Sequence, residues 1–164
     1  MKKIAVAFTG PSNSGKTTLI INIANALKTQ NYKVCIVKHD PQDKAKFDKE
    51  GKDSDKFTKT GSDVVVVSPN RTTMFKHETS SMDDIVELFG DFDYLLVEGL
   101  KTVPLPRVAI FRNALDEKYF DVSDAIATDE SIDKSKIPYG CIHLDLNNVD
   151  EILGWIEQNG KRFS

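Results

Sequence analysis

Gly10-Pro11-Ser12-Asn13-Ser14-Gly15-Lys16-Thr17-Thr18, close to the N-terminus, is the stretch that decides the fold. It matches the phosphate-binding loop pattern G-x-x-x-x-G-K-[ST] at every fixed position. The pattern is informative when a buried strand precedes it and a helix follows it. Residues 4–8 form an apolar run of strand length. Downstream, apolar side chains recur at helical spacing: Leu19, Ile20, Ile23, Ala24 and Leu27.

The chemistry expected of this loop depends largely on backbone groups. Gly10 and Gly15 permit backbone angles that a side chain would prevent, so that successive N–H groups can point at phosphate oxygens. The N-terminus of the following helix adds its positive dipole end. Lys16 brings a full charge to the outer phosphates, which gives it a catalytic as well as a binding role, and the Thr17 hydroxyl is placed to ligate Mg²⁺. The predicted nucleotide-binding residues of the loop are therefore Gly10, Ser12, Asn13, Ser14, Gly15, Lys16, Thr17 and Thr18, the alternative being a plain glycine-rich turn.

Composition indicates one compact domain spanning residues 1–164, since 40% of the residues are hydrophobic and 29% are charged. A net charge of −3 gives no reason to expect nucleic acid as a partner. The two cysteines, Cys35 and Cys141, lie in separate apolar runs and are interpreted as reduced core residues of a cytoplasmic protein. No apolar run approaches the roughly 18 residues of a membrane span. The short apolar run before the loop also excludes a signal peptide.

The remaining apolar runs alternate with helical patterns. Strands are predicted at residues 33–38, 64–67, 72–77, 94–97, 108–111, 125–127 and 141–144, and helices at residues 82–89 and 149–158. The continuous valine run at residues 64–67 predicts a strand covered on both faces. This order predicts an α/β fold with a mostly parallel, doubly wound sheet in three layers, like that of P-loop NTPases, with its ligand at the carboxyl ends of the strands.

Two acids follow predicted strands and are candidate magnesium ligands beside Thr17. Glu98 ends the strand at residues 94–97, and a carboxylate there can hold a water of the metal. Asp40 ends the second strand in the same way, and it could also position an attacking water, which makes it a catalytic candidate with Lys16. The alternative for Asp40 is a turn residue before Pro41. Asp93 begins its strand and is expected to be structural.

A second anionic ligand could be bound near the second strand. Lys38 and His39 precede Asp40, and Lys52 and Asp53 lie in the segment Gly51-Lys52-Asp53-Ser54. The alternative for this segment, favoured by spacing alone, is that Asp53 or Ser54 caps a helix.

An aspartate that accepts from both ring N1–H and the exocyclic amine would favour guanine over adenine. Asp129 follows the strand at residues 125–127 and is the preferred candidate. The segment Asn113-Ala114-Leu115-Asp116 resembles the Asn-Lys-x-Asp reader of small GTPases but lacks its lysine. The alternative for Asp129 is a helix-cap or loop acid.

Several of these segments together resemble one family, the MobB molybdopterin-guanine dinucleotide biosynthesis adaptor proteins. The resemblance rests on the phosphate loop and on four further segments in the family's order: Val37-Lys38-His39-Asp40, Gly51-Lys52-Asp53-Ser54, Leu96-Val97-Glu98-Gly99 with Lys101, and residues 125–129. The chain departs from the family after Asp40, where Pro41-Gln42-Asp43 stand in place of further histidines.

The resemblance implies a GTP-binding, Mg²⁺-dependent protein with weak GTPase activity. It also implies a homodimer that cooperates with a MobA-type guanylyltransferase when GMP is attached to molybdopterin to form molybdopterin guanine dinucleotide. It shifts the segment Gly51-Lys52-Asp53-Ser54 from a helix cap toward a ligand contact.

Two other classes of function remain open from the sequence. A P-loop small-molecule kinase would use ATP, with Lys16 and Mg²⁺ serving γ-phosphoryl transfer and Asp40 as the base. A regulatory switch protein would bind GTP and move residues 40–60 between two states. A preference for ATP with fast turnover would indicate the kinase, and a nucleotide-dependent change in protection of residues 40–60 would indicate the switch.

Overall fold

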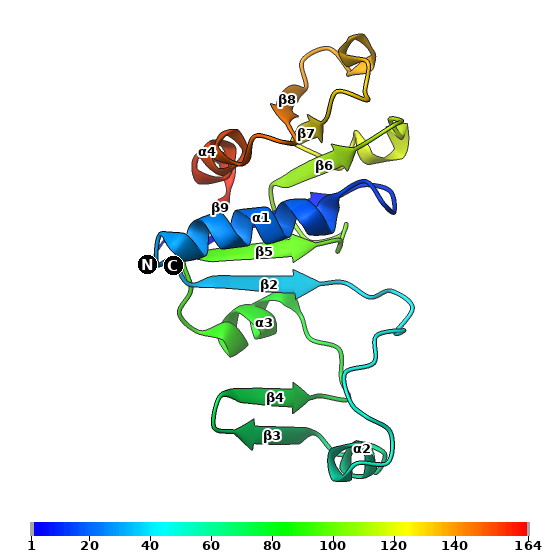
Figure 1. The fold of residues 1–164 in the computed structure, drawn as a ribbon, viewed down its shortest axis with the longest axis vertical. Helices are drawn as coiled ribbons and strands as arrows, with labels where there is room; N and C mark the ends of the chain where they lie inside the picture. The colour runs from blue at the N-terminus through cyan, green and yellow to red at the C-terminus, as the bar shows by residue number, and fades with distance from the viewer. Residues whose placement is uncertain (1, 164) are drawn as a thin grey trace. The chain divides into compact units, whose positions relative to one another are not determined.

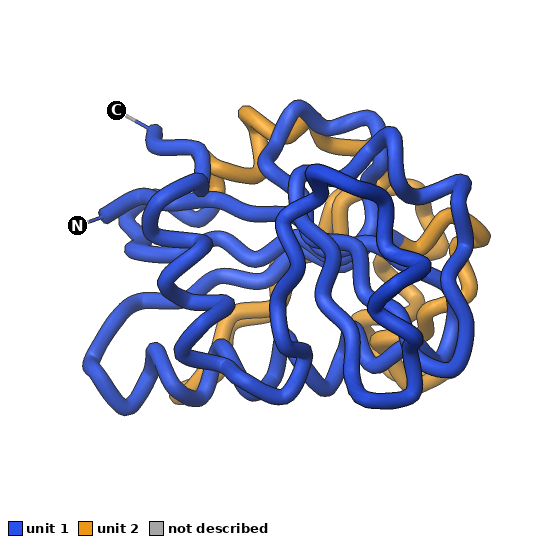
Figure 2. The backbone as a smooth tube through the Cα atoms, turned by 90° about the horizontal axis from the view of Figure 1, so that it is seen from above, with its two compact units in different colours: residues 1–39, 89–164 blue, residues 40–88 orange. Residues whose placement is uncertain are grey.

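The computed structural model describes residues 2–163 of the 164-residue chain. It contains two compact units, one formed by residues 1–39 and 89–164 and the other by residues 40–88 (Figure 2). We refer to them as the sheet unit and the insert unit. The expectation of a single domain over residues 1–164 stays a prediction.

The sheet unit is built on a mostly parallel sheet (Figure 1). Its path runs β2-β5-β1-β6-β7-β8, and all neighbours on this path are parallel. The short strand β9 pairs antiparallel with the start of β1. The bounds are β1 Ile4–Thr9, β2 Val34–Lys38, β5 Tyr94–Glu98, β6 Arg107–Phe111, β7 Ala125–Thr128, β8 Ile142–Asp145 and β9 Lys161–Arg162.

Alternate residues of these strands face opposite sides of the sheet. On one face, Val6, Phe8 and Leu96 pack with the buried sides of α1 (Lys16–Thr29) and α4 (Val149–Asn159). On the other face, Phe111 and other strand residues pack with Tyr119 of the short 3₁₀ helix η1 (Glu117–Tyr119) and with Ile132, which precedes η2 (Lys134–Lys136). The predicted three-layer α/β fold with a doubly wound sheet is therefore confirmed.

Local signals explain where the helices begin. The Asn148 side chain accepts from Glu151 N–H at the start of α4. In the insert unit, Ser81 and Asp84 cap α3 (Met82–Phe89) reciprocally, because each side chain accepts from the backbone N–H of the other residue. None of the helices in the described residues 2–163 is long and apolar enough to cross a membrane.

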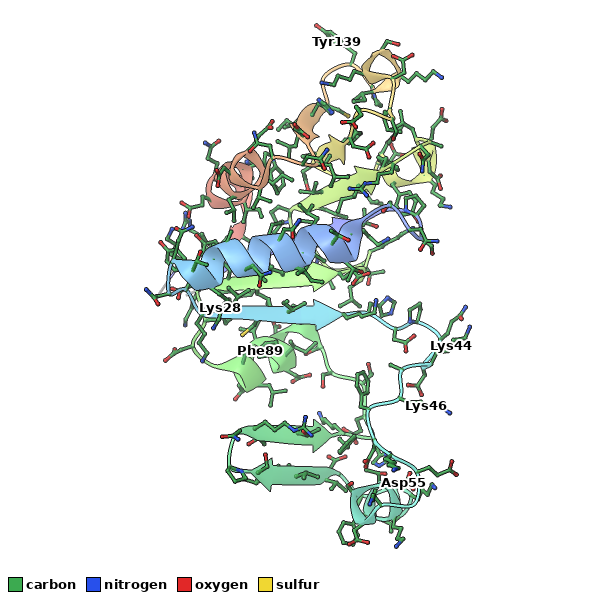
Figure 3. All side chains as sticks on the ribbon, viewed as in Figure 1. Lys28, Lys44, Lys46, Asp55, Phe89 and Tyr139 are labelled. Atoms are coloured by element: carbon green, nitrogen blue, oxygen red, sulfur yellow. The ribbon has the colours of Figure 1, made fainter. Side chains whose placement is uncertain are left out.

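The insert unit contains α2 (Asp53–Thr58) and an antiparallel hairpin of β3 (Val64–Ser68) and β4 (Arg71–Phe75). The predicted burial of the valine run on both faces was wrong, since Val65 and Val67 are exposed in a two-stranded sheet. The predicted cap of α2 by Asp53 or Ser54 was also wrong. Asp55, labelled on α2 in Figure 3, instead accepts from the Gly51 N–H at 2.8 Å.

Candidate phosphate-binding site

The loop between β1 and α1 requires glycine at both ends. Gly10 has a φ of 140°, and a Cβ at this position would lie 2.3 Å from the backbone oxygen of Ile110 on β6. Gly15 has a φ of 96° and occupies the N-cap of α1. Residues with a side chain rarely adopt either φ value. The backbone conformation of the loop therefore explains why glycine stands at both positions.

The backbone N–H groups of this loop are uncommitted. Between Ser12 and Thr18, none donates a hydrogen bond to any part of the chain that the structure describes. The Ser14 side chain is buried, and its Oγ also has no hydrogen-bond partner among residues 2–163. Most residues of this loop are exposed, so their N–H groups are open to solvent or to a ligand, and the buried Ser14 hydroxyl without a partner indicates a place for an external acceptor. An anion with several oxygens, such as a polyphosphate, fits this set of donors.

Lys16 supplies the charge at this site. Its ammonium group donates to the backbone oxygens of Gly10 at 3.1 Å and Pro11 at 2.6 Å, which folds the side chain back over the loop. Partial burial lowers the pKa of Lys16, while the nearby Glu98 opposes this effect. The side chain lines a pocket of about 450 Å³, which we call the phosphate pocket, together with other loop residues, Glu98 and Arg112.

Glu98 and Thr17, two of the residues that the sequence suggests as magnesium ligands, line the same phosphate pocket. Glu98 ends β5 and is held there in the register of β1 and β2, opposite Phe8 and Lys38. Its side chain is 15% exposed and lies 3.3 Å from the Lys38 ammonium group. One hydroxyl and one carboxylate fit Mg²⁺, which keeps several waters and takes other ligands from substrate phosphates. No cluster of three metal-ligating side chains occurs within residues 2–163.

Arg107 anchors the turn that follows Glu98. Its guanidinium group is buried and donates to the backbone oxygens of Gly99 at 2.8 Å, Leu100 at 2.9 Å and Val103 at 3.1 Å. Burial lowers the pKa of this guanidinium group, and Asp124 opposes the effect. Arg107 is thus a structural residue that fixes the backbone beside Glu98.

Asp129 lies at the end of β7, as expected, and its carboxylate is already engaged. One oxygen accepts from both the N–H and the hydroxyl of Ser131, and the other lies 3.2 Å from Nε of Arg112. The pKa of Asp129 is lowered, mainly by the hydrogen bond that its carboxylate accepts from the Ser131 hydroxyl. A carboxylate offers about four acceptor positions. Because these contacts already occupy three of them, the Asp129 carboxylate can hardly accept the two hydrogen bonds that a guanine edge would donate.

The alternative base reader, Asp116, has a local structural role. Its side chain accepts from the Lys118 N–H at the start of η1 and lies 2.7 Å from the Lys118 ammonium group. It lines neither the phosphate pocket nor the neighbouring hollow described below.

The remaining predicted residues divide between the two units. Lys38 and His39 lie next to Glu98, where the His39 N–H donates to the Glu98 backbone oxygen at 3.0 Å. Lys52 and Asp53 belong to the insert unit, where Asp53 pairs with Lys56.

Asp40 also belongs to the insert unit. Its carboxylate accepts from the N–H groups of Gln42, Lys44 and Ala45, which supports the turn interpretation. Its proposed metal and catalytic roles, like the second-ligand role of Lys52 and Asp53, stay predictions.

The sequence reasoning missed Arg112 as a residue of the site. It directly follows β6, and the strand-end argument that selected Glu98 and Asp129 applies to it equally.

Comparisons with known proteins agree with this fold. The family model described as "MobB: Molybdopterin guanine dinucleotide synthesis protein B" matches residues 5–129. The chain belongs to the MobB family. It is 29% identical over 160 residues to the molybdopterin-guanine dinucleotide biosynthesis adapter protein of Haemophilus influenzae, covering 93% of this chain and 86% of the relative. A probable adapter protein of Bacillus subtilis is 31% identical over 130 residues, covering 74% of this chain and 73% of the relative.

A solved MobB structure has the same fold. The crystal structure of molybdopterin-guanine biosynthesis protein B (mobB) superposes with a TM-score of 0.73 at 24% identity, covering 94% of this chain and 99% of the other. The matched family region includes the phosphate loop, Glu98, Arg112 and Asp129. The P-loop NTPase-like fold predicted for the chain is therefore confirmed, and its MobB membership connects it to molybdopterin guanine dinucleotide synthesis.

Proposed function

We propose that this chain is a GTP-binding adaptor with weak GTPase activity that assists the conversion of molybdopterin to molybdopterin guanine dinucleotide. The observation that carries the proposal is the loop of uncommitted N–H groups between Ser12 and Thr18, closed by the Lys16 ammonium group. Membership of the MobB family supports the biosynthetic context.

In this proposal the loop binds the phosphates through its N–H groups, with Lys16 on the outer phosphates. Thr17 and Glu98 hold Mg²⁺, directly or through a water. The metal would neutralise phosphate charge when it is bound. The residues that select guanine lie after β7, where the sequence suggests Asp129.

Slow hydrolysis is supported by the contacts of Asp40. A carboxylate that already accepts from three backbone N–H groups is poorly available to orient an attacking water. The adaptor would therefore present a bound nucleotide to a partner more readily than it would consume it.

The proposed partners are a MobA-type guanylyltransferase and molybdopterin or its guanine dinucleotide, in the cytoplasm. Lys38 and His39 in the sheet unit are candidate residues for this second, anionic ligand, and the insert unit separately offers Lys52 and Asp53. We also propose a homodimer, which sedimentation of the purified chain tests directly, since a monomer at micromolar concentration would contradict it.

Reconstitution tests the function. Purified chain is added to a MobA-type guanylyltransferase with molybdopterin, GTP and Mg²⁺, and formation of the dinucleotide is followed. The wild-type chain should raise the rate, and Lys16→Ala should not, because it loses the charge that holds the outer phosphates. Lys134→Ala, which removes an exposed lysine outside the phosphate pocket, is the matched control.

Two results would contradict the adaptor. The first is equal stimulation by the wild-type chain and by Lys16→Ala. The second is rapid consumption of ATP once a small acceptor is added, which would indicate the P-loop kinase instead.

A further inference from the structure

A second, smaller hollow adjoins the phosphate pocket and shares Gly15, Thr18 and Arg112 with it. Its volume is about 140 Å³, and its other lining residues are Leu19, Asn22, Leu146 and Asn147. We call it the side slot. Pockets for drug-sized ligands measure about 300–1,000 Å³, so the side slot suits a fragment such as one planar ring system.

The order of the strands places the two hollows on opposite sides of the phosphate loop. Glu98 ends β5, which neighbours β1 on one side, and it lines only the phosphate pocket. Leu146 follows β8, at the other end of the sheet, and it lines only the side slot. A nucleotide whose outer phosphates and metal lie at Lys16 and Glu98 would therefore direct its other end, the base, toward the side slot.

The Arg112 side chain lines both hollows. Its Nε lies 3.2 Å, and its Cζ 3.3 Å, from the position that a Cβ of Gly15 would occupy, so its guanidinium group packs directly on the loop. Nε is buried and lies 3.2 Å from Asp129 without the alignment of a hydrogen bond. A planar guanidinium group can stack on a ring and donate to phosphate oxygens, which suits a residue between a base and its phosphates.

The side slot contains both apolar and amide groups. Leu19 and Leu146 are buried and can pack against a ring. The carboxamides of Asn22 and Asn147 form no hydrogen bond with the rest of residues 2–163. Asn148, the next residue, differs because its side chain caps α4. Asn147 is thus the amide of this loop that is available to a ligand.

The backbone also holds Asn147 close to the end of β7. The Leu146 N–H donates to the backbone oxygen of Thr128 at 2.9 Å, and the Asn147 N–H donates to the Asp145 side chain at 2.8 Å. The backbone that carries the Asn147 side chain is therefore held by two neighbouring strands, as a residue that reads a base edge requires.

We propose that the side slot holds the purine base of the nucleotide, that Asn147 contributes the hydrogen bonds that distinguish guanine from adenine, and that Arg112 covers the nucleoside side of the ligand. The inference rests on the proposed nucleotide binding and deepens it. Asp129 then acts as a positioning residue: it holds Arg112 in place instead of contacting the base.

The test is calorimetric titration of the full chain with GTP, ATP and inorganic tripolyphosphate in Mg²⁺. Asn147→Ala should lower the ratio of GTP to ATP affinity about tenfold, as expected for the loss of one hydrogen bond to the base edge. Asn148→Ser, which keeps a capping side chain at the adjacent position, should leave the ratio unchanged.

The arginine is tested with the same ligands. Arg112→Gln should weaken GTP and ATP about tenfold each and tripolyphosphate less than about threefold, since tripolyphosphate has no nucleoside. Asp129→Asn should weaken both nucleotides and leave their ratio unchanged. Arg162→Gln, on β9, is the matched control, and thermal unfolding of each variant shows that it is folded.

Two outcomes would overturn the inference. In the first, Asp129→Asn abolishes the preference for GTP while Asn147→Ala keeps it, which would make Asp129 the direct reader. In the second, Arg112→Gln weakens tripolyphosphate as much as GTP, which would place Arg112 on the outer phosphates. Failure of the proposed nucleotide binding itself is distinct, because the wild-type chain would then bind none of the three ligands.

Discussion

The ammonium group of Lys38 lies 3.3 Å from the Glu98 carboxylate, where the neighbouring strands β2 and β5 end together. The Lys38 side chain is 66% exposed, whereas that of Glu98 is 15% exposed and faces the phosphate pocket. An ion pair this open to solvent contributes about 0–1 kcal/mol. The lysine is therefore a weak competitor for the carboxylate, and Mg²⁺ can take its place.

Replacing Glu98 tests the magnesium site. Glu98→Gln should raise the Mg²⁺ concentration that gives half-maximal nucleotide binding about tenfold, because the neutral amide holds a metal-bound water less firmly. Lys38→Met should change this concentration less than about threefold. Nucleotide titrations at a series of Mg²⁺ concentrations measure both, with Glu117→Gln as the control. Equal Mg²⁺ dependence in wild type and Glu98→Gln would exclude the assignment.

Gly10 is expected to be intolerant of a side chain. Gly10→Ala places a Cβ 2.3 Å from the Ile110 oxygen at a φ of 140°, which should lower the free energy of unfolding by about 2–4 kcal/mol and abolish nucleotide binding. Gly140→Ala is the control, since its φ of 86° is also unfavourable but no atom lies within 4 Å of the added carbon. It should cost only about 1 kcal/mol. Denaturant unfolding measures the free energy of unfolding of both variants. A similar loss of stability in the two would refute the steric explanation.

Arg107 should be important for stability and for the geometry beside Glu98. Arg107→Met leaves the backbone oxygens of Gly99, Leu100 and Val103 without their donor, at a cost of about 2–4 kcal/mol in unfolding free energy. The same change at the exposed Arg162 should cost less than about 0.5 kcal/mol. Chemical denaturation measures both. If Arg107→Met is as stable as wild type, the three hydrogen bonds do not hold the turn.

Asp93 should make the free energy of unfolding depend on pH in the acid range. Its carboxylate accepts from the Lys33 N–H at 2.9 Å and the Lys2 N–H at 3.0 Å, and these contacts hold the pKa of Asp93 below its ordinary value. A carboxylate whose pKa is lower in the folded protein stabilises it above the unfolded pKa of about 3.9 and loses this effect as the pH falls through the lowered value.

The matching variant is Asp93→Asn. It should reduce the free energy of unfolding at pH 7 by about 1 kcal/mol, a modest value because the group is partly exposed to solvent. Denaturant unfolding between pH 7 and pH 2.5 should show this difference shrinking at the acid end. A difference that stays constant over the whole range would mean that the charge of Asp93 is unimportant.

Most of the sheet unit was predictable because its strands and helices have strong local signals. The phosphate loop fixed the order of β1 and α1, and the apolar run ending at Glu98 identified β5 and its acid. Parallel strands end at the same edge of a sheet, so the side chains that follow them could be assigned to one site.

The insert unit was harder to predict, and the reason lies in the valine run of β3. A continuous β-branched run shows that a strand forms but does not show what covers it. Here the run pairs with β4 as a hairpin, and Val65 and Val67 remain exposed. The interpretation as a strand was right, and the predicted burial was wrong.

The contacts of Asp129 could also not be predicted from the sequence. Arg112 lies far from Asp129 along the chain, and the two meet because β6 and β7 are neighbours in the sheet. Strand order determines such contacts, and local patterns do not specify it. Asp129 could therefore be placed at the site, but its engagement with Arg112 and Ser131 could not be foreseen.

The central claim is that the phosphate loop serves a guanine nucleotide. Calorimetric titration of the wild-type chain and of Lys16→Ala with GTP and with ATP, both in Mg²⁺, tests it most directly. The account predicts that the wild-type chain binds GTP at least about tenfold more tightly than ATP, and that Lys16→Ala loses GTP binding. Tighter binding of ATP than of GTP, or GTP binding that survives in Lys16→Ala, would contradict it.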